Sequence, residues 1–260
     1  MHLQLENKVI VITGGAKGIG AAITRSCAQE GAVPIVIDRD KEAGPRIERE
    51  LTAAGMAGAW VDVDLLQEDA TRQAAARIAQ KYGRIDGLVN NAGVNDRVGL
   101  ERGSPLEYLA SLERNLLHYY NMAHFCLPHL KKSQGAIVNV SSKTAVTGQG
   151  GTSGYASAKG AILALTREWA AELLAYGIRV NAIVPAEVMT PLYRQWLSTF
   201  PHPEEKLKNI VARIPLGARM TEPAEIADAA VFLLSPKAGH ITGQHWYVDG
   251  GYVHLDRALT

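Results

Sequence analysis

The sequence predicts a doubly wound α/β fold, in which one parallel sheet of seven strands carries helices on both faces and forms a single domain over residues 1–260. Two observations predict it. Short β-branched runs alternate with longer helical patterns, which is the order of right-handed βαβ units. The runs are apolar at nearly every position, as expected for strands buried on both faces of a parallel sheet.

Each strand is expected at one of these runs. In chain order they are VIVIT (9–13), VPIVID (33–38), GAWVDV (58–63), DGLVN (86–90), AIVNVS (136–141), IRVNAIV (178–184) and WYVDG (246–250). Only residues 190–220 break the alternation, because PLYRQWLSTFPHPEEK is rich in proline and aromatic residues and precedes the helical KLKNIVARI. We expect this segment to form a small mobile lid before the last helix and strand.

The bulk composition argues against several classes of function. The formal net charge is +1 and no basic patch stands out, so a nucleic acid is not expected as a partner. The start MHLQLENK does not resemble a signal peptide and no apolar run approaches the roughly 18 residues that cross a bilayer, so we expect a cytoplasmic protein without a membrane partner. Cys27, Cys126 and the eight histidines lack metal-ligand spacing, so no metal site is expected.

The first strand leads into TGGAKGIG (13–20) and then into a helical run. Glycines at 14, 18 and 20 permit a tight turn, close approach of the backbone to a pyrophosphate, and close packing of the helix on the strand. The helix N-terminus adds partial positive charge for the phosphate. The pattern predicts the phosphate-binding turn of a dinucleotide site, and the alternative is a strand-to-helix turn of purely structural use.

Asp38 ends the second strand, eighteen residues after Gly20. A carboxylate at this point can accept hydrogen bonds from both ribose hydroxyls of an adenosine and repels a 2′-phosphate, which predicts NAD rather than NADP. Arg39 is a complication, because a guanidinium can pair with such a phosphate. The alternative use of Asp38 is to cap the next helix.

YASAK places Tyr155 and Lys159 four residues apart in a helical run, so both side chains share one face. An unperturbed tyrosine has a pKa near 10, and a neighbouring ammonium lowers that pKa by stabilising the phenolate. Upstream, a strand ends in Ser141 and Ser142, so a serine can reach a substrate oxygen beside the tyrosine. This predicts acid–base chemistry, and the alternative is a Y-x-x-x-K pair on a solvated helix face.

These motifs together resemble a classical short-chain dehydrogenase/reductase, a family with a Rossmann-type fold. The resemblance rests on the TGxxxGxG turn, NNAG (90–93), the serine at 142 and Y-x-x-x-K, and it extends to TGQHWYVDGG near the end. It implies that Ser142 polarises the substrate, that Tyr155 is the acid/base, and that Lys159 lowers the tyrosine pKa and holds the nicotinamide ribose. Asn115 matches the family's fourth residue, which holds a water in a proton relay. Alternation along the strand sends Ser141 to the other face.

The same resemblance implies a nicotinamide cofactor, with NAD favoured over NADP, and the residues that contact it. These are Gly14, Lys17, Gly18, Ile19, Gly20, Asp38, Arg39, Asp62, Val63, Asn90, Ala92, Gly93, Tyr155, Lys159, Pro185, Val188 and Thr190. Asp62 can accept from the adenine amino group, whereas Val63 and Val188 would act through their backbone. The family is usually tetrameric, which implies a homotetramer in which Tyr252 or His254 reaches a neighbouring subunit's site.

The segment VPAEVMT (184–190) departs from the family pattern, in which this strand usually ends in proline-glycine. Here Glu187 adds a carboxylate near the expected nicotinamide, where it suits paired hydroxyls and disfavours an acyl chain or a steroid. The other residues expected around the substrate are Asn95, Asp96, Ser142, Lys143, Thr144, Gln149, Tyr155 and Trp196. Polar groups with one aromatic suit a sugar. The alternatives are exposed loop positions and, for Glu187, an ion pair with a residue such as Arg194.

The stretches SSKTAVTGQ, PAEVMTPLY and VDGGY resemble sugar-oxidising members of the family described as L-fucose dehydrogenases. That resemblance implies NAD-dependent oxidation of the anomeric (C1) hydroxyl of L-fucose or a related aldopyranose to the lactone. The nearest alternative is a 3-oxoacyl-[acyl-carrier-protein] reductase, which shares the catalytic residues and usually works reductively with NADPH. A non-catalytic relative is a further alternative, against which the intact Ser142, Tyr155 and Lys159 argue.

Overall fold

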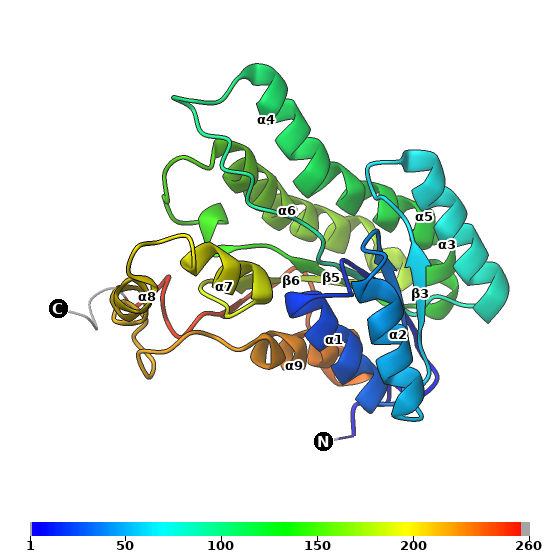
Figure 1. Ribbon diagram of the computed structural model, residues 1–260. Helices are drawn as coiled ribbons and strands as arrows, with labels where there is room; N and C mark the ends of the chain where they lie inside the picture. The colour runs from blue at the N-terminus through cyan, green and yellow to red at the C-terminus, as the bar shows by residue number, and fades with distance from the viewer. Residues whose placement is uncertain (1, 256–260) are drawn as a thin grey trace.

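The computed structural model describes residues 2–255 and contains one seven-stranded sheet in the order β3-β2-β1-β4-β5-β6-β7 (Figure 1). Every neighbouring pair in the sheet is parallel. The strands are β1 Val9–Thr13, β2 Val33–Asp38, β3 Ala59–Asp62, β4 Gly87–Asn90, β5 Ala136–Val140, β6 Arg179–Pro185 and β7 His245–Val248. The predicted fold is confirmed, and each predicted strand end lies within two residues of the observed one.

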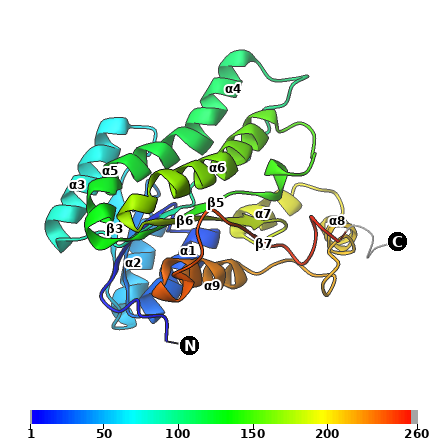
Figure 2. The same ribbon diagram turned by 180° about the vertical axis from the view of Figure 1, so that it is seen from behind.

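Helices cover both faces of the sheet, as Figures 1 and 2 show from opposite sides. On one face lie α1 Gly18–Gln29, α2 Ala43–Ala53 and α9 Pro223–Leu234, and on the other lie α3 Glu68–Tyr82, α4 Pro105–Leu112, α5 His118–Ser133 and α6 Ser153–Glu172. A π-helical turn, η1 Glu113–Leu117, joins α4 to α5, and short 3₁₀ turns are η2 Lys143–Ala145, η3 Leu174–Tyr176 and η4 Pro236–Ala238.

The strands are apolar throughout because alternate residues serve the two helical layers. Val9 and Val11 of β1 belong to the core beneath α3, α5 and α6, whereas Ile10 and Ile12 belong to the core beneath α1 and α9. None of these four side chains is more than 3% exposed. Burial on both faces explains why the β1 run carries no polar alternation.

The strand order reverses at β1, which pairs with β2 on one side and with β4 on the other. In sheets of this kind the connections leave the two strands toward opposite faces, so a crevice opens at their carboxyl ends. The turn after β1 and the loop after β4 therefore form the two walls of the principal cleft.

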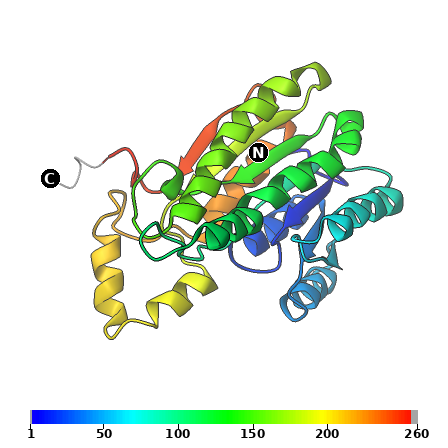
Figure 3. The same ribbon diagram turned by 90° about the horizontal axis from the view of Figure 1, so that it is seen from above.

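Residues 190–220 carry two short helices, α7 Pro191–Leu197 and α8 Pro203–Val211. Viewed from above, they stand at one end of the molecule, beyond the sheet (Figure 3). A β-bridge between Val188 and Thr221 ties the two ends of this segment together. Its movement as a lid stays a prediction. Among residues 2–255, none of the helices combines the length and the apolar character that a membrane span requires.

Candidate active site

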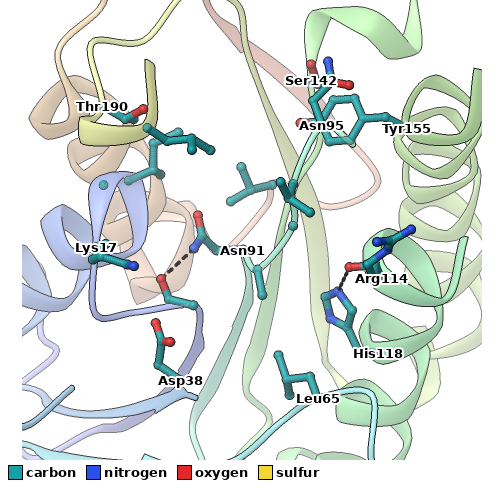
Figure 4. A pocket seen from close by; sticks show the side chains of 18 of the residues that line it. Lys17, Asp38, Leu65, Asn91, Asn95, Arg114, His118, Ser142, Tyr155 and Thr190 are labelled. Atoms are coloured by element: carbon teal, nitrogen blue, oxygen red, sulfur yellow. Dashed lines mark hydrogen bonds between the residues drawn. The ribbon is translucent and has the colours of Figure 1, made fainter. Parts of the chain in front are cut away.

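A cleft of about 730 Å³ runs along the carboxyl ends of the strands. Most of the predicted site residues line it: Gly14, Lys17, Gly18, Ile19, Asp38, Arg39, Val63, Ala92, Gly93, Asn95, Ser142, Tyr155, Lys159, Pro185, Val188 and Thr190. Figure 4 shows several of them facing the same space. The remaining predicted residues are not part of the wall: Gly20, Asp62, Asn90, Asp96, Asn115, Lys143, Thr144, Gln149, Glu187 and Trp196.

The phosphate-binding turn is shaped by two glycines. Gly14 has φ +63°, and a Cβ there would lie 2.9 Å from the Cα of Ala92. At Gly20 a Cβ would lie only 2.1 Å from the carbonyl oxygen of Gly14, so Gly20 permits α1 to start directly against the turn. The N-terminus of α1 at Gly18 then faces the cleft, where it suits a phosphate group.

The loop after β4 is held against this turn by Thr13 and Asn91. The Thr13 hydroxyl accepts from the backbone N–H of Asn91 at 2.9 Å, and Asn91 Nδ2 donates to the carbonyl oxygens of Thr13 and Gly14 at 3.0 and 3.1 Å. Asn90 points the other way: its side chain is fully buried and donates to Asn139 Oδ1 at 3.0 Å. Any cofactor contact by Asn90 therefore has to come from its backbone.

Asp38 ends β2 with its carboxylate at the cleft (Figure 4). It accepts from the backbone N–H of Ala16 at 3.2 Å and of Asp40 at 3.0 Å. The carboxylate that binds the start of α2 is that of Asp40, which accepts from the backbone N–H groups of Glu42 and Ala43 at 3.0 and 2.8 Å, while the N-cap is Glu42. The alternative use of Asp38 as a helix cap is therefore not what the structure shows.

The cations around Asp38 are each paired with an aspartate. The pairs are Lys17–Asp40 at 2.5 Å, Arg39–Asp64 at 3.1 Å and Lys41–Asp62 at 3.4 Å. Pairing with Lys41 directs the Asp62 side chain outward, with 43% of it exposed, which explains why Asp62 is absent from the cleft wall where Asp64 is present.

Ser142 is the hydroxyl available to a ligand. It follows β5, caps η2 by accepting from the backbone N–H of Thr144 at 3.2 Å, and lies next to the Tyr155 ring (Figure 4). Ser141 is occupied, because its Oγ donates to the carbonyl oxygen of Lys159 at 2.8 Å. The geometry agrees with the choice of Ser142 over Ser141.

Tyr155 lies in the first turn of α6, and its pKa is the main correction to the sequence-based expectations. Burial raises the pKa of Tyr155 to about 12, and the neighbouring Ser142 hydroxyl acts more weakly in the opposite direction. Lys159 does not produce the expected lowering, because its Nζ lies 5.6 Å from the Tyr155 ring centre and is engaged elsewhere. The protonated phenol is therefore the favoured form with these residues alone.

Lys159 is held by a closed set of hydrogen bonds. Its Nζ donates to Tyr119 Oη at 3.0 Å and to the carbonyl oxygen of Val140 at 2.8 Å, and Tyr119 Oη donates to the same carbonyl at 2.9 Å. Burial lowers the pKa of Lys159 to about 7. The ammonium is thus fixed in position and close to losing its proton at neutral pH.

Asn115 lies in the π-helical turn η1, an irregularity often found at functional sites. Its Oδ1 accepts from the backbone N–H of Val94 at 2.7 Å, and its Nδ2 donates to the carbonyl oxygen of Ser111 at 3.0 Å. A Cβ on Gly93 would lie 3.1 Å from Asn115 Oδ1. The side chain therefore positions the loop after β4, and the proton relay stays a prediction.

On the substrate side, Lys143 and Glu187 form an ion pair whose side chains are only 11% and 12% exposed. Tyr193 of α7 donates its hydroxyl to the second Glu187 oxygen at 2.7 Å. The ring centre of Tyr252 lies 4.2 Å from Lys143 Nζ. The ion-pair alternative for Glu187 is correct in kind, but the partner is Lys143 and not Arg194.

The other predicted substrate residues are distributed unevenly. Asn95 lines the cleft, whereas Gln149 is exposed and outside it. Trp196 packs against Tyr193 and Phe200, with ring centres 5.0 and 4.9 Å away. Four residues that were not expected in the site also belong to the cleft or support it: Asn91 of NNAG, and His118, Tyr119 and Tyr193, which belong to no motif. Of these, only Tyr119 has a spacing that could have identified it, four residues after Asn115 on one helix face.

Among residues 2–255, no three His, Cys, Asp or Glu side chains lie close enough together to bind a metal ion. Burial raises the pKa of both Cys27 and Cys126 to about 12, so neither thiol is a ready nucleophile.

Comparison with protein families matches residues 14–253 to the model described as enoyl-(acyl carrier protein) reductase. Among curated proteins, the chain is 36% identical to L-fucose dehydrogenase of Bos taurus over 252 residues, covering 96% of this chain and 91% of that protein. It is 38% identical to 3-oxoacyl-[acyl-carrier-protein] reductase FabG of Thermotoga maritima over 255 residues, covering 96% of this chain and 100% of that protein.

Two solved structures show the same architecture. The structure titled Cj0485 dehydrogenase is 48% identical, with a TM-score of 0.94 over 99% of this chain and 98% of that one. The aldohexose dehydrogenase of Thermoplasma acidophilum is 31% identical, with a TM-score of 0.86 over 96% of this chain and 95% of that one. Both similarities cover nearly the whole of this chain.

Proposed function

Because the chain belongs to the short-chain dehydrogenase/reductase family, we propose that it is an NAD-dependent dehydrogenase that oxidises the anomeric hydroxyl of L-fucose or a related aldopyranose to the lactone. The glycine turn, the free N-terminus of α1 and the carboxylate of Asp38 suit a dinucleotide. Bound nicotinamide supplies the acceptor for the hydride that leaves C1.

Each catalytic residue has a distinct task in this reaction. Ser142 donates to the substrate hydroxyl oxygen and fixes it beside Tyr155. Tyr155, as phenolate, removes the hydroxyl proton. Burial opposes that phenolate and Lys159 alone does not offset it, so the positive charge of a bound oxidised nicotinamide would have to add to that of Lys159. Lys159 also donates to the nicotinamide ribose. Asn115 keeps the loop after β4 in place and is proposed to hold the relay water.

The preference for NAD is supported by the pairing of the cations around Asp38. A 2′-phosphate needs an unpaired Arg or Lys, but Lys17 and Arg39 are each bound to an aspartate. Asp38 adds a further negative charge at the position of the ribose. NADP would have to displace these partners before it could bind.

The observation that carries the sugar assignment is the Lys143–Glu187 pair, whose members lie outside the cleft wall but directly follow the wall residues Ser142 and Ala186 in the chain. An ammonium and a carboxylate side by side offer one donor and one acceptor, which matches two neighbouring hydroxyls of a pyranose. Glu187 already accepts from the Tyr193 hydroxyl, so the carboxylate is oriented for hydroxyl donors. The names of the L-fucose and aldohexose dehydrogenases support the same substrate class.

A second candidate function is 3-oxoacyl-[acyl-carrier-protein] reduction, which the Thermotoga maritima relative and the family description favour. The same catalytic groups would serve this reduction, with Tyr155 donating a proton to the ketone oxygen instead of removing one from a hydroxyl. Against it stands the Lys143–Glu187 pair next to the wall residues Ser142 and Ala186, because an apolar acyl chain offers these two charged groups no hydrogen-bond partner.

The test is a spectrophotometric panel of L-fucose, D-arabinose, L-galactose, D-glucose and an acetoacetyl thioester, each with NAD(H) and NADP(H). We expect turnover of one or more sugars with NAD and a kcat/KM at least about 100-fold lower with NADP, the factor of an interaction worth roughly 2.7 kcal/mol. Activity confined to the thioester would replace the sugar assignment with the reductase, and equal use of NADP would remove the cofactor assignment.

We also propose a homotetramer in the cytoplasm. Tyr252, expected to reach a neighbouring subunit, contacts Lys143 of its own chain, and the His254 ring lies 4.4 Å from that of Tyr247. The C-terminal segment therefore supports the substrate side from within one subunit. The proposed assembly does not depend on that contact, and light scattering measures it directly.

A further inference from the structure

Lys159 is a buried cation without a carboxylate partner. Only 2% of its surface is exposed, and the ion pairs formed within residues 2–255 do not include it. Two neutral oxygens accept from its Nζ instead, namely Tyr119 Oη at 3.0 Å and the carbonyl oxygen of Val140 at 2.8 Å. A buried charge without a counter-ion is costly unless hydrogen bonds replace the lost water. These two oxygens therefore support the charge of Lys159.

Tyr119, the second residue of α5, is itself fixed in one orientation. Its side chain is fully buried, and its Oη donates to the carbonyl oxygen of Val140 at 2.9 Å. Because a phenol has a single proton and Val140 accepts it, the oxygen offers only lone pairs to Lys159. Burial holds the pKa of Tyr119 well above its ordinary value, so the hydroxyl stays neutral. Tyr119 is thus a fixed acceptor and not a second acid or base.

The hydrogen bonds to Tyr119 and Val140 also decide how the Lys159 ammonium can act. An ammonium has three donors, and two of them are used inside the protein, so one is left for the cleft that Lys159 lines. A Cβ on Gly93 would lie 3.5 Å from Nζ, so the loop after β4 closes a further direction. Nζ is therefore held at one place, and it cannot move without losing the bond to Tyr119.

No other side chain around Lys159 takes over this task. The titratable groups near it are Tyr119 and His118 of α5 and Tyr155 of its own helix, whereas β5 presents the Val140 carbonyl and the loop after β4 presents Gly93. Burial lowers the pKa of Lys159 to about 7, and that of His118 to about 4, so the histidine is neutral at pH 7. None of these groups supplies a negative charge to the ammonium.

We propose that Tyr119 is a positioning residue for catalysis, which fixes the Lys159 ammonium and keeps it charged by supplying its one side-chain acceptor within residues 2–255. The proposal rests on the proposed function only in requiring that a charged Lys159 assists the Tyr155 phenolate. Tyr119 lies outside the cleft wall, so it acts through Lys159 and does not touch substrate or cofactor.

The direct test is Tyr119→Phe, which removes the hydroxyl and keeps the ring. Protein labelled with carbon-13 at lysine Cε reports the ionisation of Lys159 by NMR, and the signal that Lys159→Met lacks identifies it. The midpoint of the Lys159 titration should fall by about 1 pH unit, as expected for the loss of one hydrogen bond to a charged group. Tyr120→Phe, at the neighbouring half-exposed tyrosine outside the cleft wall, is the matched control and should keep the wild-type midpoint.

The kinetic test separates positioning of the charge from a structural role. The kcat/KM of Tyr119→Phe should lie below that of wild type by less than about 2-fold at pH 5.5, where both lysines are protonated, and by about 9-fold at pH 8, as a midpoint lowered by one unit requires. A variant that is merely less well packed would show the same deficit at both pH values. The substrate is the sugar that the panel turns over best, with NAD⁺.

An unchanged Lys159 midpoint in folded Tyr119→Phe, or an equal deficit at the two pH values, overturns the proposal and leaves Tyr119 a structural residue. Should circular dichroism show that Tyr119→Phe is unfolded, 4-fluorophenylalanine in place of Tyr119 fills the volume of the hydroxyl with a much weaker acceptor, and the same two measurements decide. The NMR titration needs no substrate. A lowered midpoint in a protein whose wild type turns over nothing in the panel would contradict the proposed function and uphold the contact of Tyr119 with Lys159.

Discussion

The cofactor end of the cleft is shaped by backbone, whereas the substrate end is shaped by side chains from distant segments. Gly20 meets the carbonyl of Gly14 within one turn, in an approach that any Cβ would block. Lys143 and Glu187 meet across 44 residues, and Tyr193 of α7 joins them. One end depends on conformations that few residue types adopt, and the other depends on partners that the fold brings together.

This difference predicts which substitutions should affect all substrates and which should affect only one substrate class. A change in the glycine turn would weaken binding of the cofactor and would therefore lower the activity toward every substrate. A change in the Lys143–Glu187 pair would alter one substrate class and leave the turn intact. Tyr155 and Lys159 stand between the two ends, so their substitution should affect chemistry without removing either binding surface.

The largest expected effect is that of Tyr155→Phe. Removing the phenol removes the proton acceptor, so kcat should fall by about 10³-fold while the Kd for NAD⁺ changes less than about 2-fold. Steady-state kinetics and calorimetry measure the two quantities. Tyr176→Phe, at a half-exposed tyrosine outside the cleft wall, is the matched control and should keep full activity. Retained turnover in Tyr155→Phe would remove its assigned role.

The next effect separates the substrate end from the cofactor end. Lys143→Met or Glu187→Gln leaves one buried partner unpaired, so each should destabilise the protein by about 2–3 kcal/mol and raise KM for the sugar. The double variant should recover most of the stability but not the KM. Urea unfolding and initial-rate kinetics are the measurements.

Asp69→Asn is the matched control for this cycle, because it breaks a fully solvated pair with Arg72 and should leave both the stability and the KM for the sugar nearly unchanged. A Glu187→Gln variant with unchanged KM for sugars would show that the pair supports the fold and does not read the substrate. KM for NAD should stay constant in every variant of the cycle.

The smallest effect concerns Lys159 and pH. Its pKa is lowered to about 7 in the folded chain from 10.5, so between these values the unfolded chain binds a proton that the folded chain has released. Wild-type stability should therefore rise with pH by about 1 kcal/mol per unit from pH 7.5 to 9.5. Lys159→Met lacks this contribution. The free energy of unfolding of the variant minus that of wild type should therefore fall as the pH rises over the same range.

Lys132→Met, on the exposed surface of α5, is the control for the Lys159 experiment and should follow the wild-type pH dependence. Denaturant unfolding at two pH values is sufficient, because the remaining groups contribute equally to both proteins. A constant difference between wild type and Lys159→Met would mean that the buried lysine keeps its proton throughout.

Sequence reasoning predicted the fold, and it placed Ser142, Tyr155 and Lys159 at the cleft, because both follow from local patterns. Apolar runs indicated the buried strands. Alternation of side chains along β5 predicted that Ser142 and Ser141 point to opposite faces, and the Ser141 hydroxyl is indeed bound to the carbonyl oxygen of Lys159. The glycine turn could also be predicted, because its spacing reflects backbone approach within eight residues. These features need no knowledge of which distant segments meet.

The rest could not be predicted, because it depends on contacts across the fold. The outward turn of Asp62 toward Lys41 and the choice of Lys143 as partner for Glu187 follow from tertiary placement. The pKa of Tyr155 is set by burial more than by its neighbour in YASAK. His118 lines the cleft and belongs to no motif.

The central claim is oxidation at C1 of a sugar, and isotope transfer tests it most directly. The sugar that the panel turns over best is deuterated at C1 and incubated with NAD⁺, and the reduced cofactor is analysed by mass spectrometry. The account predicts one deuterium in each reduced cofactor, together with formation of the lactone. Unlabelled reduced cofactor, with the deuterium retained in the sugar product, would contradict it.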